Sequence, residues 1–98
     1  MISSDEADAL AFSYMKTMET DIGVPVSLVE GSRIELEDGW VYFYNSTEYL
    51  LGGSERSALF GNSPFIVDAN DGAILELGTY SSVNASLERL GRIRKSSK

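Results

Sequence analysis

This 98-residue sequence contains no cysteine and no histidine. Without cysteine the chain has no disulfide framework, no thiol nucleophile and no thiolate ligand for zinc. Without histidine it lacks the usual general base of enzymes and the commonest metal ligand. Together the two absences predict a protein with no catalytic residues, no metal site and no cofactor.

Long apolar runs are also missing. No stretch approaches the roughly 20 apolar residues that span a bilayer. The first six residues lack the basic region and following apolar run of a signal peptide. The sequence therefore predicts a cytoplasmic protein that does not act on membranes.

Basic residues are few, and most of them lie near one end of the sequence. Residues 1–88 hold all 15 acidic residues and only three basic ones, a formal charge of −12, whereas residues 89–98 carry +5. An acidic body disfavours nucleic acid, because nucleic-acid binding depends on Lys and Arg contacts to phosphates. The same charge suits a protein partner with a basic surface.

The remaining composition is that of a globular protein, with 43% hydrophobic and 23% charged residues. A chain of this length folds as one domain, 1–98, and buries roughly 65% of its unfolded surface. We predict an α+β fold, with an N-terminal helix packed on a mainly antiparallel sheet of four or five strands, a short central helix and a C-terminal helix. The basic tail, 92–98, is expected to fray.

The N-terminal helix is expected over residues 4–20. Ser3 and Glu6 have the spacing of a capping box. Apolar residues follow at helical spacing, which predicts a buried stripe. Its members are Ala7, Leu10, Ala11, Tyr14, Met15 and Met18.

Two later helices have recognisable starts. Asn45 or Ser46 can cap a short helix that ends at Leu51. Ser82 can cap the last helix, whose inward-facing residues are expected to be Val83, Leu87 and Leu90.

The first half of the sheet is expected to centre on residues 39–45, which hold the only tryptophan and two of the five tyrosines. An edge strand is expected over 24–28, where Pro25 is tolerated. Asp38-Gly39 predicts a tight turn between strands 33–37 and 40–44.

The predicted turn gives this hairpin two different faces. One face pairs Leu36 with Val41 and Ile34 with Phe43, and is expected to receive the N-terminal helix. The other pairs Glu37 with Trp40, Glu35 with Tyr42 and Arg33 with Tyr44. Its aromatic rings could form a second core layer or a partner surface, since aromatic residues and Arg are enriched at interface centres.

A second hairpin is expected between residues 64–69 and 73–77. A three-residue loop with a left-handed Gly72 would place Phe65 opposite Leu77, Val67 opposite Leu75 and Ala69 opposite Ala73. We prefer this register to that of a two-residue loop, because it gives one apolar face.

Acidic clusters offer only weak signs of chemistry. Residues 68–72 partly match a calcium loop, but Thr79 stands where that loop needs glutamate. Glu35, Glu37 and Asp38 could imitate a catalytic carboxylate pair, yet neighbouring acids on a hairpin are usually just solvated.

Three ordered segments resemble the bacterial immunity protein 35 family, which includes YrhB-like proteins. They are Gly39-Trp40 with its aromatic strand and Tyr49-Leu50, then Gly61-Asn62-Ser63-Pro64 with Asp68, and then Gly72 with Leu77-Gly78-Thr79. The resemblance covers about residues 34–90. It implies an α+β protein of a polymorphic toxin system, which neutralises a cognate toxin by binding it without catalysis.

The alternative function is that of a YrhB-like chaperone, a holdase or a stress-related binding protein. The chain is expected to be a monomer or a weak homodimer. We expect the toxin to have a basic surface and to meet acidic residues that ring aromatic ones. The expected contacts are Glu35, Glu37, Asp38, Trp40, Tyr42, Glu48 and Glu55.

Overall fold

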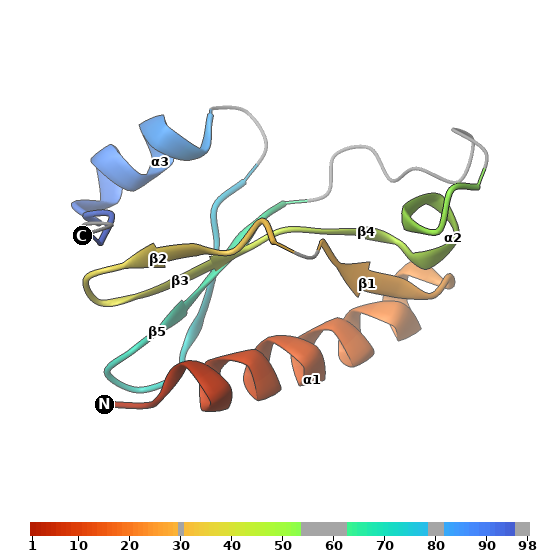
Figure 1. Cartoon of the computed structure of the whole chain (residues 1–98), viewed down its shortest axis with the longest axis horizontal. Coiled ribbons are helices and arrows are strands. Elements are labelled where there is room, and N and C mark those ends of the chain that lie inside the picture. The colour runs from red at the N-terminus through yellow and green to blue at the C-terminus, as the bar shows by residue number, and fades with distance from the viewer. Residues whose placement is uncertain (30, 54–62, 79–81, 96–98) are drawn as a thin grey trace.

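The computed structural model describes residues 1–29, 31–53, 63–78 and 82–95 (Figure 1). Its elements are α1 Ser4–Ile22, β1 Val26–Leu28, β2 Ile34–Leu36, β3 Gly39–Tyr42, β4 Tyr44–Ser46, α2 Thr47–Leu50, β5 Phe65–Asp68, β6 Ile74–Glu76 and α3 Val83–Leu90. The predicted α+β class is confirmed. Within these ranges no helix has the length and apolar character needed to cross a membrane.

α1 begins at the predicted cap. The Ser3 hydroxyl accepts the Glu6 N–H at 3.2 Å, and the Glu6 carboxylate accepts the Ser3 N–H at 3.1 Å, so the capping box is confirmed. Gly23 ends the helix with φ at +85° and donates its N–H to the Glu19 carbonyl. The helix therefore reaches Ile22 rather than residue 20.

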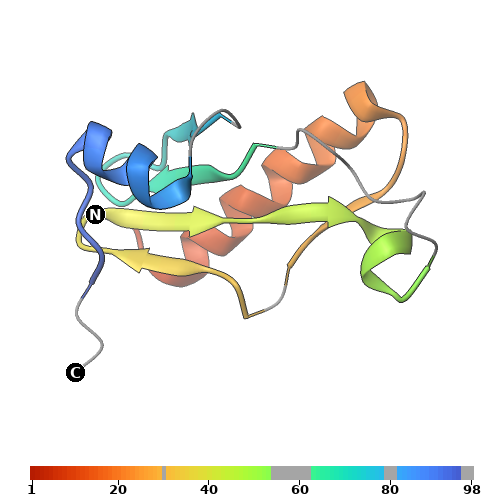
Figure 2. The ribbon, with the colours of Figure 1, turned by 90° about the horizontal axis from the view of Figure 1, so that it is seen from above.

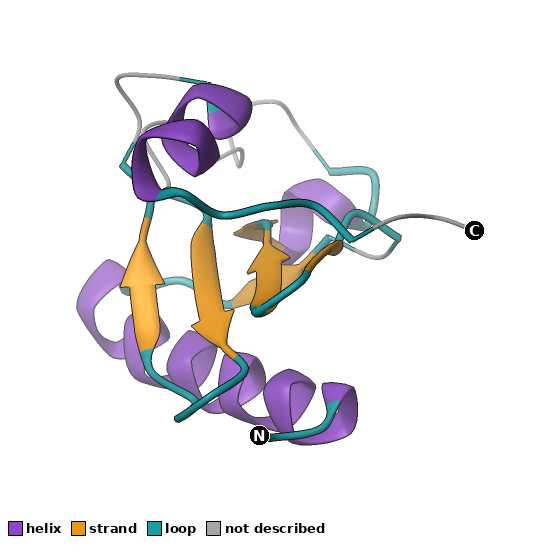
Figure 3. Cartoon of the chain, turned by 90° about the vertical axis from the view of Figure 1, so that its left-hand side faces the viewer, coloured by secondary structure: helices purple, strands orange, loops and turns teal. Residues whose placement is uncertain are grey.

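The strands form two antiparallel sheets between two helices. Four strands in the order β2-β3-β5-β6 form the main sheet, and β1 pairs with β4 in a smaller one. α1 covers one face of the main sheet and α3 covers the other (Figure 3). β4 continues the path of β3 beyond Phe43, so one long stretch of chain links the two sheets (Figure 2).

Two apolar clusters fill the spaces on either side of the main sheet. The cluster against α1 contains Ala7, Ala11, Met15, Val26, Tyr42, Tyr44, Phe65 and Val67. The cluster on the α3 side contains Leu36, Val41, Ile66, Leu77 and Leu87. The prediction that α1 covers the face of Ile34 and Val41 is therefore wrong. The aromatic face packs on α1 instead, where the small, fully buried Ala7 and Ala11 leave room for large rings.

Phe65 lies at the centre of the cluster under α1. Its ring centroid is 4.7 Å from that of Tyr14, 5.6 Å from Tyr42 and 6.2 Å from Tyr44. Tyr42 is 3% exposed and Tyr44 is 7% exposed. Of the two interpretations that the sequence left open for these rings, the structure supports core packing.

The first hairpin has a different register from the predicted one. Ile34 lies opposite Val41 and Leu36 lies opposite Gly39, a shift of two residues that keeps each side chain on its expected face. Gly39 does not supply a positive φ to the turn. It lies in β3 beside β5, where a Cβ atom would come within 2.5 Å of the Val67 carbonyl oxygen. Close strand approach, rather than turn geometry, explains this glycine.

The second hairpin also departs from its predicted register. Phe65 lies opposite Glu76 and Val67 opposite Ile74. The Asp68 N–H donates to the Ala73 carbonyl at 2.9 Å, which leaves a four-residue loop, 69–72. The backbone of Ala69 is engaged elsewhere, since its N–H donates to the Asp38 carbonyl and its own carbonyl accepts the Ile2 N–H, both at 2.8 Å. Tertiary hydrogen bonds therefore replace the expected pairing of Ala69 with Ala73.

Gly72 was correctly predicted to be left-handed, with φ at +74°. Gly72→Ala is expected to lower the free energy of unfolding by about 1–2 kcal/mol through backbone strain. The new Cβ would also lie 2.8 Å from Leu10 Cδ1, but this atom ends a flexible side chain that is 39% exposed and can turn away at little cost. Gly91→Ala is the matched control, since Gly91 has φ at +69° but a methyl group there would meet nothing within 4 Å. Urea melts should show similar losses for the two variants, because each replaces a left-handed glycine, and a neutral Gly72→Ala would contradict the backbone strain.

α3 and the segment after it close the fold. Ser82 caps α3 and Leu87 is buried, as predicted, but Leu90 is 40% exposed rather than inward. The tail 92–98 was expected to fray; residues 96–98 lie outside the described residues, whereas 92–95 are hydrogen-bonded to the rest of the fold. The Glu37 N–H donates to the Ile93 carbonyl at 2.8 Å, and the Lys95 N–H donates to the Glu35 carbonyl at 2.9 Å. This short segment covers the outer edge of β2.

Candidate partner-binding surface

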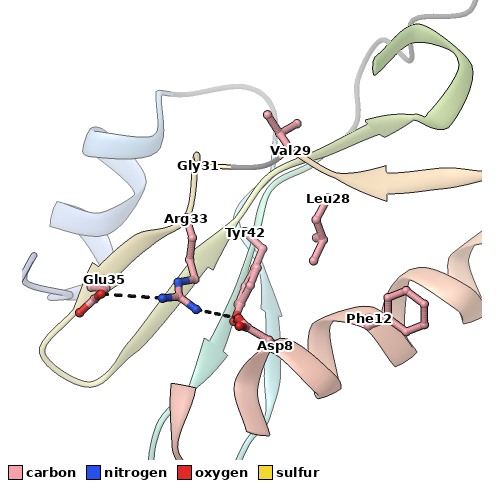
Figure 4. A pocket seen from close by; sticks show the side chains of 8 residues that line it. All are labelled: Asp8, Phe12, Leu28, Val29, Gly31, Arg33, Glu35 and Tyr42. Carbon is pink, nitrogen blue, oxygen red and sulfur yellow. Dashed lines mark hydrogen bonds and ion pairs between the residues drawn. The ribbon is translucent and has the colours of Figure 1, made fainter. Parts of the chain in front are cut away.

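An open pocket lies between the first half of α1 and the chain that runs from β1 to β2 (Figure 4). Its volume is about 580 Å³, and its lining residues are Asp8, Phe12, Leu28, Val29, Gly31, Arg33, Glu35 and Tyr42. Asp8 and Phe12 share one helix face because they are four residues apart. The other lining residues belong to β1, β2, β3 and the segment that joins β1 to β2.

Asp8 is the centre of the polar contacts in this pocket. Its Oδ1 accepts the Tyr42 hydroxyl at 2.5 Å and an Arg33 N–H at 2.8 Å. Burial opposes the charge of Asp8, but these two donors outweigh it and hold the pKa of Asp8 below its usual value. Burial and the bond to Asp8 raise the pKa of the Tyr42 hydroxyl.

The hydrogen bond that Tyr42 donates to Asp8 contributes to both pKa shifts. Asp8 stays ionised and Tyr42 stays protonated throughout the neutral range, so neither is tuned to exchange a proton near pH 7. Across the described ranges, no three carboxylates are grouped closely enough to hold a metal ion. The arrangement anchors α1 to β3 and to Arg33, just before β2, and offers a mixed charged and apolar surface to a ligand.

Two smaller hollows continue this surface along β1. One, of about 410 Å³, is lined by Ser27, Leu28, Val29, Thr47, Leu50 and Leu51. The other, of about 370 Å³, is lined by Phe12, Met15, Lys16, Glu19, Pro25, Val26, Ser27, Leu28 and Thr47. Leu28 lines all three cavities. We call the combined surface the β1 groove.

The predicted acidic cluster lies at the β2–β3 turn, where basic side chains partly neutralise it. Asp38 Oδ2 is 3.0 Å from Arg92 Nη1, and Glu35 Oε2 is 3.9 Å from Lys95 Nζ. Glu37 is exposed on the turn itself. The sequence placed these acids together correctly, but it did not predict that the basic segment would return to them.

The other predicted contacts are scattered. Trp40 is partly buried on the α1 side of the sheet, and Tyr42 is in the core, with its hydroxyl at the pocket. Glu48 is exposed on α2, at the opposite end of the molecule from the β2–β3 turn (Figure 1). Glu55 lies outside the described residues. The predicted contacts therefore do not form one patch.

Sequence reasoning missed the pocket residues that come from α1. Phe12 is 58% exposed although it belongs to an amphipathic helix, and it falls outside the predicted apolar stripe. A large apolar residue on the polar face of a helix was the available signal. Nothing near Asp8 in the sequence predicted its role, because its partners Arg33 and Tyr42 are 25 and 34 residues away.

Comparisons with known proteins point in one direction. A family model described as Immunity protein 35 matches residues 5–89. The chain is also 33% identical to a protein of Escherichia coli (strain K12) named "Uncharacterized protein YrhB", over 90% of this chain and 87% of the relative. No solved structure shows significant similarity.

Proposed function

Because this chain belongs to the immunity protein 35 family, we propose that it binds a cognate protein toxin and neutralises it without catalysis. The observation that carries this proposal is the family match, which extends over residues 5–89. The pocket supports the non-catalytic part of this proposal, since its polar side chains Asp8, Arg33 and Tyr42 are already engaged in hydrogen bonds with one another. A cytoplasmic location and a monomeric or weakly dimeric state remain predictions.

The charge of the protein supports a basic partner. The net charge is −7, and Glu35 and Glu37 are exposed at one end of the main sheet. Exposed charges of this kind accelerate encounter with an oppositely charged protein. We therefore keep Glu35, Glu37 and Asp38 as proposed partner contacts, with Trp40 beside them and Glu48 at the far end.

We expect a toxin domain to be encoded beside this protein's gene, and the direct test uses that domain. That domain is expressed in a bacterial host with and without this chain, and binding of the purified pair is measured by calorimetry. We expect restored growth and a stoichiometric complex, from which denaturation and refolding return toxin of unchanged mass and activity. Permanently modified toxin would contradict non-catalytic binding. No complex, together with suppressed aggregation of unrelated unfolded proteins, would favour the holdase alternative.

Charge reversal tests the role of the acidic turn. Glu37→Lys is expected to slow association with the toxin several-fold and to weaken its dependence on salt, because the long-range attraction is reduced. Folding should change little, since exposed charges contribute little to stability. The matched control is Asp21→Lys, at the exposed C-terminal end of α1. Stopped-flow binding across a salt series measures both, and equal rates for Glu37→Lys and the wild type would place the steering charges elsewhere.

A further inference from the structure

β1 has one edge that no other strand covers in the described structure, because β1 pairs with β4 alone. Val29 donates its N–H to the Phe43 carbonyl at 2.9 Å, and Thr47 donates to the Pro25 carbonyl at 3.0 Å. Bonded positions alternate along an antiparallel pair. The backbone N–H and C=O of Leu28, one position before Val29, therefore point away from β4.

The chain protects the edge on both sides of Leu28. On one side, the outward N–H of Val26 donates to the Glu19 carboxylate at 2.8 Å. On the other side, residues 93–95 lie along the outer edge of β2. Exposed strand edges are usually protected in this way. The outward backbone groups of Leu28 are left between two protected stretches.

If a further strand paired with the free edge of β1, its side chains would lie in the hollows of the β1 groove. Successive side chains of a strand point to opposite faces. On one face such side chains would meet Phe12, which is 58% exposed, and on the other they would meet Leu51, which is 82% exposed. Backbone pairing combined with pockets for alternate side chains is how sheet edges recognise extended peptides.

The chemistry of the occupant follows from charge. The groove is lined by the acids Asp8, Glu19 and Glu35 and by the bases Lys16 and Arg33, which leaves one net negative charge. The whole chain carries −7, so a second copy of the chain would be repelled. The neighbouring edge, that of β2, already binds a basic segment of the chain, Ile93-Arg94-Lys95. Lys95 of this segment pairs with Glu35. We propose that the β1 groove binds an extended, basic segment of the toxin, which adds to the free edge of β1 through Leu28.

This inference rests on the proposed function, and it separately predicts that toxin binding protects the Leu28 amide from hydrogen exchange. Amide-resolved hydrogen exchange is measured on the full chain, alone and with the purified neighbouring toxin domain. The Leu28 amide should exchange at least tenfold more slowly in the complex, whereas the Val29 amide, already bonded to Phe43, should change less. A toxin that binds without protecting Leu28 would overturn the groove proposal alone. A toxin that does not bind would overturn both proposals.

A pair of variants tests the backbone contact. Leu28→Pro removes the outward N–H, and proline is tolerated on edge strands. Leu28→Ala is the matched control, since it removes most of the side chain but keeps the N–H. We expect Leu28→Pro to weaken toxin binding at least tenfold more than Leu28→Ala does, with similar circular dichroism spectra.

Equal binding by the two Leu28 variants would overturn the backbone role. If Leu28→Pro fails to fold, the exchange result on the wild-type chain decides. Sedimentation of the chain alone tests the other occupant, because self-association that Leu28→Pro abolishes would assign the edge to a second copy.

Discussion

Phe65→Ala is expected to lower the free energy of unfolding by about 3–5 kcal/mol, as for other large buried aromatic residues. Phe65 is fully buried, and three tyrosine rings from α1, β3 and β4 pack around it. Removing its ring leaves a cavity that these rings cannot all collapse into. Because small domains are stable by only about 5–15 kcal/mol, a large part of the population should unfold at moderate temperature.

Phe12→Ala is the control for this change, since it removes the same ring from a position that is 58% exposed. Its effect on stability should stay within about 0.5 kcal/mol. Denaturant titrations followed by tryptophan fluorescence measure both variants. Similar midpoints for the two variants would contradict the central position of Phe65 in the core.

Arg92→Met is expected to cost about 2–3 kcal/mol. Arg92 Nη2 donates to Asp68 Oδ2 at 2.8 Å, Nη1 pairs with Asp38 at 3.0 Å, and the Arg92 side chain is only 16% exposed. Removing a cation from a buried pair leaves unpaired carboxylates, which typically costs about 3–5 kcal/mol. We expect less here, because the Asp38 side chain is 44% exposed. Lys16→Met, at a side chain that is 60% exposed, is the control and should be nearly neutral.

The effect of Arg92 should depend on pH in a defined direction. A hydrogen bond from the Asn70 backbone and the contact with Arg92 hold the pKa of Asp68 below its usual value. A lowered carboxyl pKa stabilises the fold above the unfolded value, and this stability is lost as pH falls through the folded value. The difference between the wild type and Arg92→Met should therefore be largest at neutral pH and shrink below about pH 4. A constant difference down to pH 2 would argue against the ion pair.

Local patterns predicted the helices well, because their signals lie within a few residues of each other. Ser3 and Glu6 specify the start of α1, and Ser82 specifies that of α3. The strand registers could not be predicted, since distant partners decide them. Gly39 serves the approach of β5, and Ala69 bonds to Asp38 and Ile2. Neither contact leaves a trace in the sequence near the turn.

In the candidate site too, features set by neighbouring residues were predictable and features set by distant residues were not. The acids of the β2–β3 turn are neighbours in sequence, so their clustering was predictable. The β1 groove is assembled from α1, α2, β1, β2, β3 and the segment between β1 and β2, and its shape depends on how far the helices lie from the strands. Exposed Phe12 was a usable local signal, whereas the free backbone of Leu28 follows only from the pairing of β1 with β4.

Residues 92–95, which cover the outer edge of β2, affect the order in which the protein folds on the ribosome. Chains are synthesised from the N-terminus and begin to fold as they emerge. Residues 92–95 follow every helix and strand that the structure describes, so the outer edge of β2 stays bare after the rest of the sheet can form. A nascent or shortened chain that ends before Arg92 presents an unprotected strand edge, to which another chain can pair. Premature termination near residue 91 is therefore expected to yield chains that aggregate although they contain all the described helices and strands.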